Sequence, residues 1–236
     1  MSRAGSIARV LLATRAMATR FELVLAGQDE LELRAAGEEA LREITACERT
    51  FSLFERASLL AHLHRSAGRD WVRLDEDSFG LFRLCDELVR TSGGAFDPTV
   101  GGALRRRGLH RVEGEPELVR YAAGWQHVEL DSLRRAVRLS DPSLRLDFGG
   151  IAKGHALDLA GRILREAGIE SAFLQGGTSS ALAIGAPDDR TGWGIGLGDG
   201  STAPRALLCD RAFSFSARDR RAHVIAPRTG ALAPGA

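Results

Sequence analysis

The sequence predicts an α+β fold, with mixed or antiparallel sheets and flanking helices. Two observations support this class. Short segments with the alternating apolar pattern of strands outnumber the segments with helical spacing, and the helical segments fall in the first two thirds of the chain. This arrangement differs from the regular alternation of strand and helix that a parallel βαβ fold requires. The sequence also contains no repeat of fixed period, which argues against a solenoid.

The composition is that of an ordinary globular protein rather than a nucleic-acid-binding or membrane protein. Of 236 residues, 44% are hydrophobic and 27% are charged, and the formal net charge is +1. A nucleic-acid partner would require a strong basic excess, so none is expected. No apolar run approaches the roughly 20 residues that a membrane span needs. The widely spaced cysteines favour a reducing compartment, and we therefore expect a cytoplasmic protein.

Residues 1–16 are predicted to form a flexible N-terminal lead, and residues 17–236 a single domain. The lead is basic, and its short apolar patch has some likeness to the start of a signal peptide. Arg9 and Arg15 interrupt or closely bound this patch, which leaves an apolar region too short for that role.

In the first half of the chain, the apolar spacing predicts two strands, three helices and a surface excursion. Phe21, Leu23 and Leu25 alternate on one face of the first strand, and helical spacing follows it. The predicted strands are 19–25 and 71–74. The predicted helices are 30–49, a short helix that begins after its N-cap Ser58, and 79–89, which is capped by Asp75 or Asp77. The surface excursion is predicted over residues 101–120.

In the second half, alternating segments predict a hairpin and a series of strands around one further helix. The hairpin turns at Asp131-Ser132, and a later strand runs into Asp147. A helix begins near Ile151, and Gly168 is suited to end it. The predicted strands are 125–130 and 136–139 in the hairpin, then 171–175, 180–185, 193–197 and 206–209.

Residues 146–158 carry the most chemical information. Lys153 is the only lysine of the chain, although Lys and Arg together number 32. It follows the glycine pair Gly149-Gly150, at the point where a predicted strand gives way to a helix. Such a turn presents backbone N–H groups and the positive end of a helix dipole to an anion. From these residues alone, the segment is either a phosphate-binding turn or a plain strand–turn–helix connection with a solvated lysine.

Two further glycine pairs, at residues 93–94 and 176–177, also stand next to polar residues. Asp97 follows the first pair, Thr178 follows the second, and His223 precedes a Pro-Arg-Thr-Gly turn. The sequence contains none of the motifs that mark serine hydrolases, zinc sites, Rossmann folds or P-loops. Glycine turns with carboxylates, one lysine and one histidine suit a phosphate-containing ligand with a divalent metal.

The order of these motifs resembles that of the ApbE family, which comprises the FAD:protein FMN transferases, also known as flavin-trafficking proteins. The resemblance extends from Met17 to Gly230, almost the whole chain. Residues 94–100 (GAFDPTV) and 147–158 (DFGGIAKGHALD) are its most specific parts. The other matching segments are residues 17–19 (MAT), 51–58 (FSLFERAS), 175–177 (QGG) and 223–230 (HVIAPRTG).

The resemblance implies one ApbE-like α+β domain that binds FAD and uses Mg²⁺ to cleave its pyrophosphate. FMN would pass to a Thr or Ser hydroxyl of an acceptor protein, and AMP would be released. Gly150 would offer its backbone carbonyl to the metal, and His223, as the catalytic residue, would assist proton removal from the acceptor hydroxyl. The residues that would line the FAD site are Met17, Phe54, Ala95, Phe96, Asp97, Asp147, Lys153 and Ile225.

The sequence also departs from the family pattern. Phe54 stands where the family usually has Tyr, Ala226 replaces an Asp, and Ala217 replaces a Gly. The segment between Ala217 and His223 is shorter than usual, and the family's metal-binding Asp and Thr lie beyond the Pro-Arg-Thr-Gly turn, so the domain looks short at its C-terminus. The chain is therefore an active FMN transferase, a catalytically impaired flavin-binding relative that acts as an FAD carrier or interaction protein, or a remnant that binds no flavin.

Overall fold

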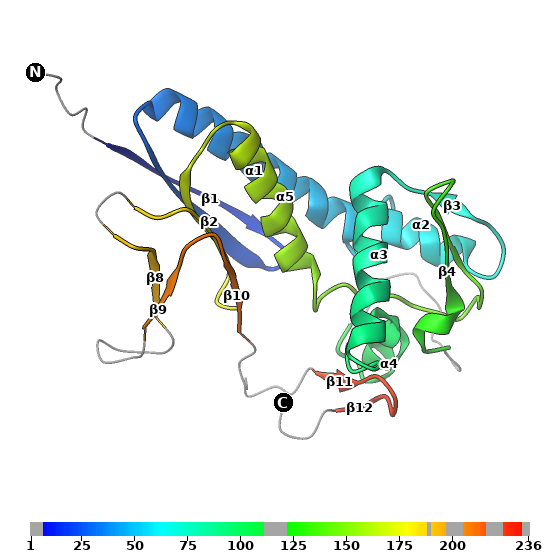
Figure 1. Ribbon diagram of the computed structural model, residues 1–236. Helices are drawn as coiled ribbons and strands as arrows, with labels where there is room; N and C mark the ends of the chain where they lie inside the picture. Colours follow the sequence, from blue (N-terminus) through cyan, green and yellow to red (C-terminus); the bar gives the residue numbers. More distant parts are fainter. Residues whose placement is uncertain (1–6, 111–121, 188–189, 197–204, 216–223, 233–236) are drawn as a thin grey trace, which may run out of the picture. The chain divides into compact units, whose positions relative to one another are not determined.

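The computed structural model describes residues 7–110, 122–187, 190–196, 205–215 and 224–232 (Figure 1). Its helices and antiparallel sheets confirm the predicted α+β class. The chain forms two compact units: unit 1 comprises Met1–Glu48 and Ile151–Ser216, and unit 2 comprises Arg49–Gly150 and Ala217–Ala236. Within the described ranges, no helix is both long and apolar enough to cross a membrane.

Unit 1 is built on an antiparallel sheet with the strand order β1-β2-β6-β7-β10. Phe21, Leu23 and Leu25 alternate along β2 as predicted and are fully buried. A slip by one residue would turn these side chains to the other face, so their burial fixes the register of the strand. The strands are β1 (Ala8–Ala16), β2 (Thr19–Gly27), β6 (Ser171–Gly176), β7 (Ser180–Ile184) and β10 (Ala212–Ser214).

The prediction of a flexible lead over residues 1–16 is wrong for residues 8–16, which form β1. This strand pairs with β2 from Ala8 opposite Gly27 to Ala16 opposite Thr19. Arg9 and Arg15, the basic residues that suggested a lead, occupy exposed positions of the strand. An edge strand accepts such outward-facing charges, and β2 gains backbone partners from it.

The helices α1 (Glu30–Phe51) and α5 (Ala152–Glu166) flank the sheet in Figure 1. Each helix carries a glycine in close contact with the sheet. A Cβ atom at Gly37 would collide with Leu12, and one at Gly161 would lie 2.6 Å from the side chain of Leu182. Leu12 and Leu182 belong to one cross-strand row that also contains Leu23, so both helices cover the same face of the sheet.

The opposite face of the sheet carries a second, smaller apolar cluster. Ala181 and Ala183 of β7 pack with Leu208, and Phe173 of β6 stacks on Trp193 with 5.8 Å between ring centroids. Leu208 and Trp193 come from a two-stranded sheet of β8 (Trp193–Gly196) and β9 (Arg205–Leu208). This small sheet therefore shields the face that the helices leave uncovered.

Unit 2 combines helices with small antiparallel sheets. Ser58 and Asp75 cap its first two helices as predicted, accepting hydrogen bonds from the backbone N–H groups of Ala61 at 2.9 Å and Ser78 at 2.7 Å. The helices are α2 (Leu59–Ser66), α3 (Glu76–Thr91) and α4 (Gly101–Arg106). One sheet consists of β3 (Val72–Arg73), β4 (Val128–Asp131) and β5 (Ala136–Leu139) in the order β3-β5-β4. In a second sheet, β11 (Ile225–Ala226) pairs with β12 (Ala231–Leu232).

An aromatic cluster forms the centre of unit 2. Phe148 meets Phe51 and Phe82 edge to face, with ring centroids 5.3 Å apart in both pairs. All three rings are buried. Phe148 directly follows Asp147, so the core anchors the backbone at the position where the sequence predicts ligand binding.

The prediction of a surface excursion over residues 101–120 is wrong for residues 101–106, which form α4. Gly101, Gly102, Ala103 and Leu104 of this helix are buried. A Cβ atom at Gly101 would lie 2.7 Å from the carbonyl oxygen of Arg145, so only glycine lets the helix start this close to that backbone. Residues 111–121 lie outside the described residues.

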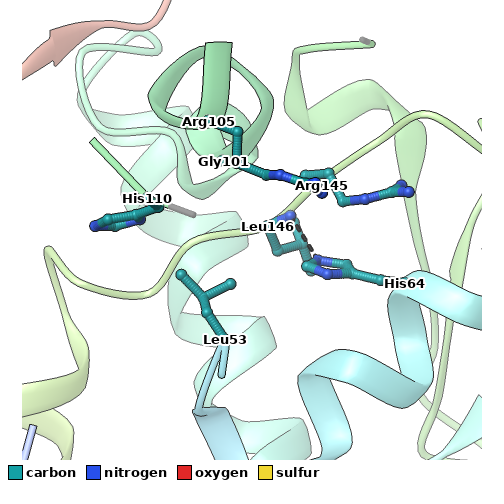
Figure 2. A pocket seen from close by; sticks show the side chains of 7 residues that line it. All are labelled: Leu53, His64, Gly101, Arg105, His110, Arg145 and Leu146. Atoms are coloured by element: carbon teal, nitrogen blue, oxygen red, sulfur yellow. Dashed lines mark hydrogen bonds between the residues drawn. The ribbon is translucent and has the colours of Figure 1, made fainter. Parts of the chain in front are cut away.

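The prediction of a strand running into Asp147 is also wrong, because residues 144–148 join no sheet. Their backbone donors find other partners. Leu146 N–H donates to His64 Nε2 at 2.9 Å (Figure 2), and Asp147 N–H donates to the carbonyl oxygen of Pro98 at 2.7 Å. A side chain and a turn thus satisfy the groups that a strand would have paired in a ladder.

Candidate functional site

Two of the sequence motifs meet directly in unit 2. The hydrogen bond from Asp147 N–H to Pro98 joins the residue 94–100 segment to the residue 147–150 segment. Beside it, the ring of Phe96 faces Gly150: a Cβ atom at Gly150 would lie 3.7 Å from Phe96 Cε2. Phe96, Asp97, Asp147 and Gly150, which the sequence placed in one site, therefore lie together.

Residues 224–232 bring a third motif to the same region. Arg228 donates a hydrogen bond from Nη2 to the carbonyl oxygen of Gly93 at 2.7 Å. Arg107 of α4 donates from Nε to the carbonyl oxygen of Gly230 at 2.8 Å. Ile225 completes the attachment, because its buried side chain packs against Ala103 and Leu104 of α4.

Asp97 shapes the turn after the first glycine pair. Its Oδ1 accepts a hydrogen bond from the backbone N–H of Thr99 at 2.9 Å, which caps the 3₁₀ turn Pro98–Val100. Gly93 and Gly94 have φ angles of 59° and 80°, a region that favours glycine. The turn leaves Ala95 exposed and Phe96 half-buried. The backbone geometry of this turn, and not only the pattern of polar and apolar side chains, therefore determines the position of residues 95–97.

Asp147 is the most enclosed carboxylate of the site, with 7% of its surface exposed. Its Oδ1 accepts a hydrogen bond from Gly149 N–H at 2.8 Å, which tightens the glycine turn. Its Oδ2 lies 2.8 Å from Nδ1 of His110. Hydrogen bonding to Asp147 raises the pKa of His110 above its ordinary value, although partial burial opposes the shift.

His110 is a site residue that sequence reasoning missed. It falls in the segment predicted to be a surface excursion, far along the chain from Asp147, and no motif marks it. Its ring also meets the ring of Phe54 edge to face, with centroids 6.4 Å apart. Phe54 is 66% exposed, so its outer face is available for stacking, the role that the resemblance gives to its ring.

Met17 and Lys153 belong to unit 1, so their proximity to Asp147 stays a prediction. Met17 lies in the tight turn between β1 and β2, where its N–H donates to Glu48 Oε1 at 2.6 Å. Lys153 is half-buried in the first turn of α5, whose first residues have no side-chain cap. The phosphate-binding turn proposed from the sequence begins in one unit and ends in the other, and as a whole it also stays a prediction.

His223 lies outside the described residues, so its catalytic role stays a prediction as well. The metal site predicted from the sequence rests on Gly150 alone. Across the part of the chain that the structure describes, no group of three or more His, Cys, Asp or Glu side chains could hold a metal ion. Near Gly150, both oxygens of Asp147 are already engaged, by Gly149 and by His110.

Comparison with known protein families identifies the family of this chain. The model of the ApbE family matches residues 17–234. The chain belongs to the ApbE family. Two curated relatives carry the name FAD:protein FMN transferase. The protein of Treponema pallidum is 28% identical over 231 residues, which cover 84% of this chain and 64% of that protein. The protein of Rhodobacter capsulatus is 38% identical over 109 residues, which cover 42% of this chain and 21% of that protein. The matched segments thus span less than two thirds of either relative.

Solved ApbE structures share the fold. The ApbE protein of Thermotoga maritima superposes with a TM-score of 0.78 and 26% identity, covering 94% of this chain and 78% of that one. The flavin transferase ApbE of Vibrio cholerae gives a TM-score of 0.79 with 21% identity, covering 95% of this chain and 78% of that one. The first likeness agrees with the family match, and the second supports the fold alone.

Proposed function

We propose that this ApbE-family chain is an FAD:protein FMN transferase. The observation that carries the proposal is the convergence in unit 2 of residues 93–97, 147–150 and 225–230, through hydrogen bonds to backbone carbonyls and through packing. These segments are far apart in the sequence, and they carry most of the residues that the resemblance assigns to FAD. Two relatives named for this activity support the proposal.

In the proposed reaction, the oxygen of a Thr or Ser hydroxyl on the acceptor protein attacks the phosphorus atom of the FMN half of FAD. A phosphate ester bond forms, the pyrophosphate P–O bond breaks, and AMP leaves with the bridging oxygen. His223 would take the hydroxyl proton. Phe54 would stack on the ligand, while the Asp97 turn and the Asp147 turn would hold it in position.

The proposal includes dependence on Mg²⁺, which would neutralise charge on the pyrophosphate when bound. The described residues supply only the Gly150 carbonyl for it, and they do not form a complete site. Mg²⁺ commonly keeps water and substrate phosphate oxygens among its ligands, and these would complete its coordination.

The decisive experiment incubates the protein with FAD, Mg²⁺ and an acceptor protein that a characterised family member flavinylates. AMP is measured by chromatography, and the flavinylated acceptor by in-gel fluorescence. We expect both products, and we expect EDTA to abolish them. Absence of AMP with every divalent metal tested would refute the transferase proposal. If FAD still quenches protein fluorescence in that case, and EDTA does not change the quenching, the chain is the catalytically impaired flavin-binding relative.

Two variants separate binding from chemistry. His223→Ala should retain FAD affinity and lose most AMP release, because only the proton acceptor is removed. Asp147→Asn should weaken FAD binding itself, because the charge that pairs with His110 is lost beside the glycine turn. Asp70→Asn is the matched control: it removes an exposed carboxylate of unit 2 outside the site and should leave both measurements unchanged.

A further inference from the structure

The turn between β1 and β2 is held by a carboxylate from a different element of unit 1. Met17 and Ala18 form this turn, and the Met17 N–H donates a hydrogen bond to Glu48 Oε1 at 2.6 Å. Glu48 belongs to α1, and the contact is half-buried. A hydrogen bond with a charged acceptor is stronger than one between neutral groups. The helix thus fixes the conformation of a turn that it does not adjoin in the sequence.

Both sides of this contact carry a local cost. Met17 and Ala18 have φ angles of 51° and 56°, in the left-handed region that disfavours residues other than glycine. Glu48 lies in the last turn of α1, where the negative end of the helix dipole disfavours a carboxylate. Backbone strain of this kind persists where the surrounding structure enforces it, and it is frequent at functional sites. The combination therefore indicates a functional reason for the contact.

The turn is also attached to the motif at residues 175–177. Gly177 N–H donates to the carbonyl oxygen of Arg20 at 2.9 Å, and Gln175 Nε2 donates to the carbonyl oxygen of Gly177 at 2.9 Å. Gly177 has a φ angle of 63°, and a Cβ atom there would collide with the Thr19 hydroxyl. Two motifs of the family resemblance therefore form one patch within unit 1.

We propose that Glu48 is a positioning residue for FAD binding, which acts through Met17. It holds the turn in its left-handed conformation, so that Met17 is in place before the ligand arrives. This inference rests on the proposed function, because the family resemblance assigns Met17 to the FAD site. Glu48 itself lies outside the segments that carry the resemblance. When only a fraction of the molecules holds the binding conformation, the apparent affinity falls by that fraction.

The experiment is a titration of FAD with the full chain, followed by the fluorescence of the flavin. Glu48→Ala should raise the Kd for FAD about ten-fold, as expected for the loss of one charge-assisted hydrogen bond. Glu38→Ala is the matched control, because it removes an exposed glutamate from the same helix and should leave the Kd unchanged. Urea unfolding establishes that each variant is folded under the conditions of the titration.

Two conservative variants distinguish the hydrogen bond from the charge. Glu48→Gln keeps the length of the side chain and an acceptor oxygen, so it should retain most of the affinity for FAD. Glu48→Asp keeps the charge but is one methylene group shorter, so it should bind FAD nearly as weakly as Glu48→Ala. This pair also tests the proposal if Glu48→Ala does not fold. Tighter binding by Glu48→Asp than by Glu48→Gln would overturn it.

The substitution Ala18→Gly gives an independent test, because glycine adopts the left-handed conformation without strain. In this background the turn needs less support, so Glu48→Ala should weaken FAD binding less than it does in the wild type. AMP release gives a further readout: Glu48→Ala should raise the KM for FAD and leave kcat nearly unchanged, because saturating FAD restores the turn. A merely structural contact would lower stability without moving the Kd or the KM.

The outcomes separate this proposal from the transferase proposal. Equal Kd values for Glu48→Ala and Glu38→Ala would overturn the positioning role, as would an undiminished loss of affinity in the Ala18→Gly background. FAD binding without AMP release would refute the transferase activity alone, and the Kd values would still decide the role of Glu48. Absence of FAD binding by the wild type would overturn both proposals.

Discussion

His110 faces Asp147 at 2.8 Å between Nδ1 and Oδ2, and about a third of its side chain remains exposed. Hydrogen bonding to the carboxylate raises the pKa of His110 in the folded protein. The folded state therefore binds a proton more tightly than the unfolded state, whose histidines titrate at about 6.5. The stabilisation from this pair is complete below the unfolded pKa and is lost as the pH rises through the folded pKa.

At the residue scale, we predict that His110→Gln destabilises unit 2 more at pH 6 than at pH 9. Urea unfolding of both proteins at the two pH values measures the difference. In an Asp147→Asn background, the same substitution should show almost no such pH dependence, because the partner charge is gone. An equal destabilisation of the wild-type background at both pH values would contradict the role of the pair.

The residues of the site differ in how far the sequence could reveal them. Asp97 and Asp147 stand in glycine turns with a recognisable motif, so they could be named from the sequence. His110 carries no local signal, because its role arises from its contact with Asp147, a residue distant in the chain. Non-local packing of this kind leaves no spacing that a single sequence shows.

At the element scale, the hairpin of β1 and β2 turns through Met17 and Ala18. Both residues have positive φ angles, 51° and 56°, which identify the geometry of a type I′ turn. Such turns favour Asn and Gly, since the left-handed region costs other residues about 1–2 kcal/mol. Glu48 holds the turn by accepting the Met17 N–H. The strain therefore sits at a residue that the family resemblance assigns to FAD.

We predict that Ala18→Gly stabilises unit 1 by roughly 0.5–1 kcal/mol. Glycine removes the strain of the left-handed backbone conformation, but part of this gain is offset because glycine increases the conformational entropy of the unfolded chain. Denaturant unfolding measures it. Ala13→Gly is the matched control, because Ala13 is an exposed residue in the middle of β1, without a positive φ angle. That substitution should instead destabilise by a similar amount. Destabilisation by both substitutions would show that the turn is not strained.

The start of α4 gives a second prediction at this scale. Gly101→Ala places a Cβ atom 2.7 Å from the backbone carbonyl oxygen of Arg145, which cannot rotate away. We expect a loss of about 1–3 kcal/mol in stability. Gly80→Ala, in the exposed interior of α3 with no atom within 4 Å of the added Cβ, should stabilise by about 0.5–1 kcal/mol. Thermal unfolding of the two variants measures both effects, and a neutral Gly101→Ala would refute the close approach.

At the scale of the whole molecule, local patterns predicted most elements and missed those that depend on distant partners. The apolar spacing of residues 30–49 and the caps at Ser58 and Asp75 predicted α1, α2 and α3 because the driving contacts recur within a few residues. β1 was missed because its exposed arginines conceal a strand that exists only through pairing with β2. Residues 144–148 have the composition of a strand, but His64 and Pro98 satisfy their backbone instead.

His64 has a consequence for the stability of all of unit 2. It is 8% exposed, and burial together with the charges of Arg145 and Arg105 lowers its pKa to about 3. Its folded pKa is below the unfolded value of about 6.5, so the unfolded state takes up a proton first as the solution is acidified. Neutral His64 contributes fully above pH 6.5, and that contribution is lost as the pH falls from there towards 3.

We therefore predict acid lability, with stability falling by roughly 1 kcal/mol for each pH unit between about 6.5 and 4. His64→Gln keeps an acceptor for the Leu146 N–H and removes the proton site, so its stability should change less between pH 7 and pH 5, even if the variant is weaker at pH 7. Urea unfolding at both pH values measures the slope. The His110–Asp147 pair stabilises the folded protein more at low pH, which opposes the effect of His64. Introducing His64→Gln into a His110→Gln background therefore isolates the contribution of His64 to the pH dependence of stability. The same slope with and without His64 would show that other groups control the acid unfolding.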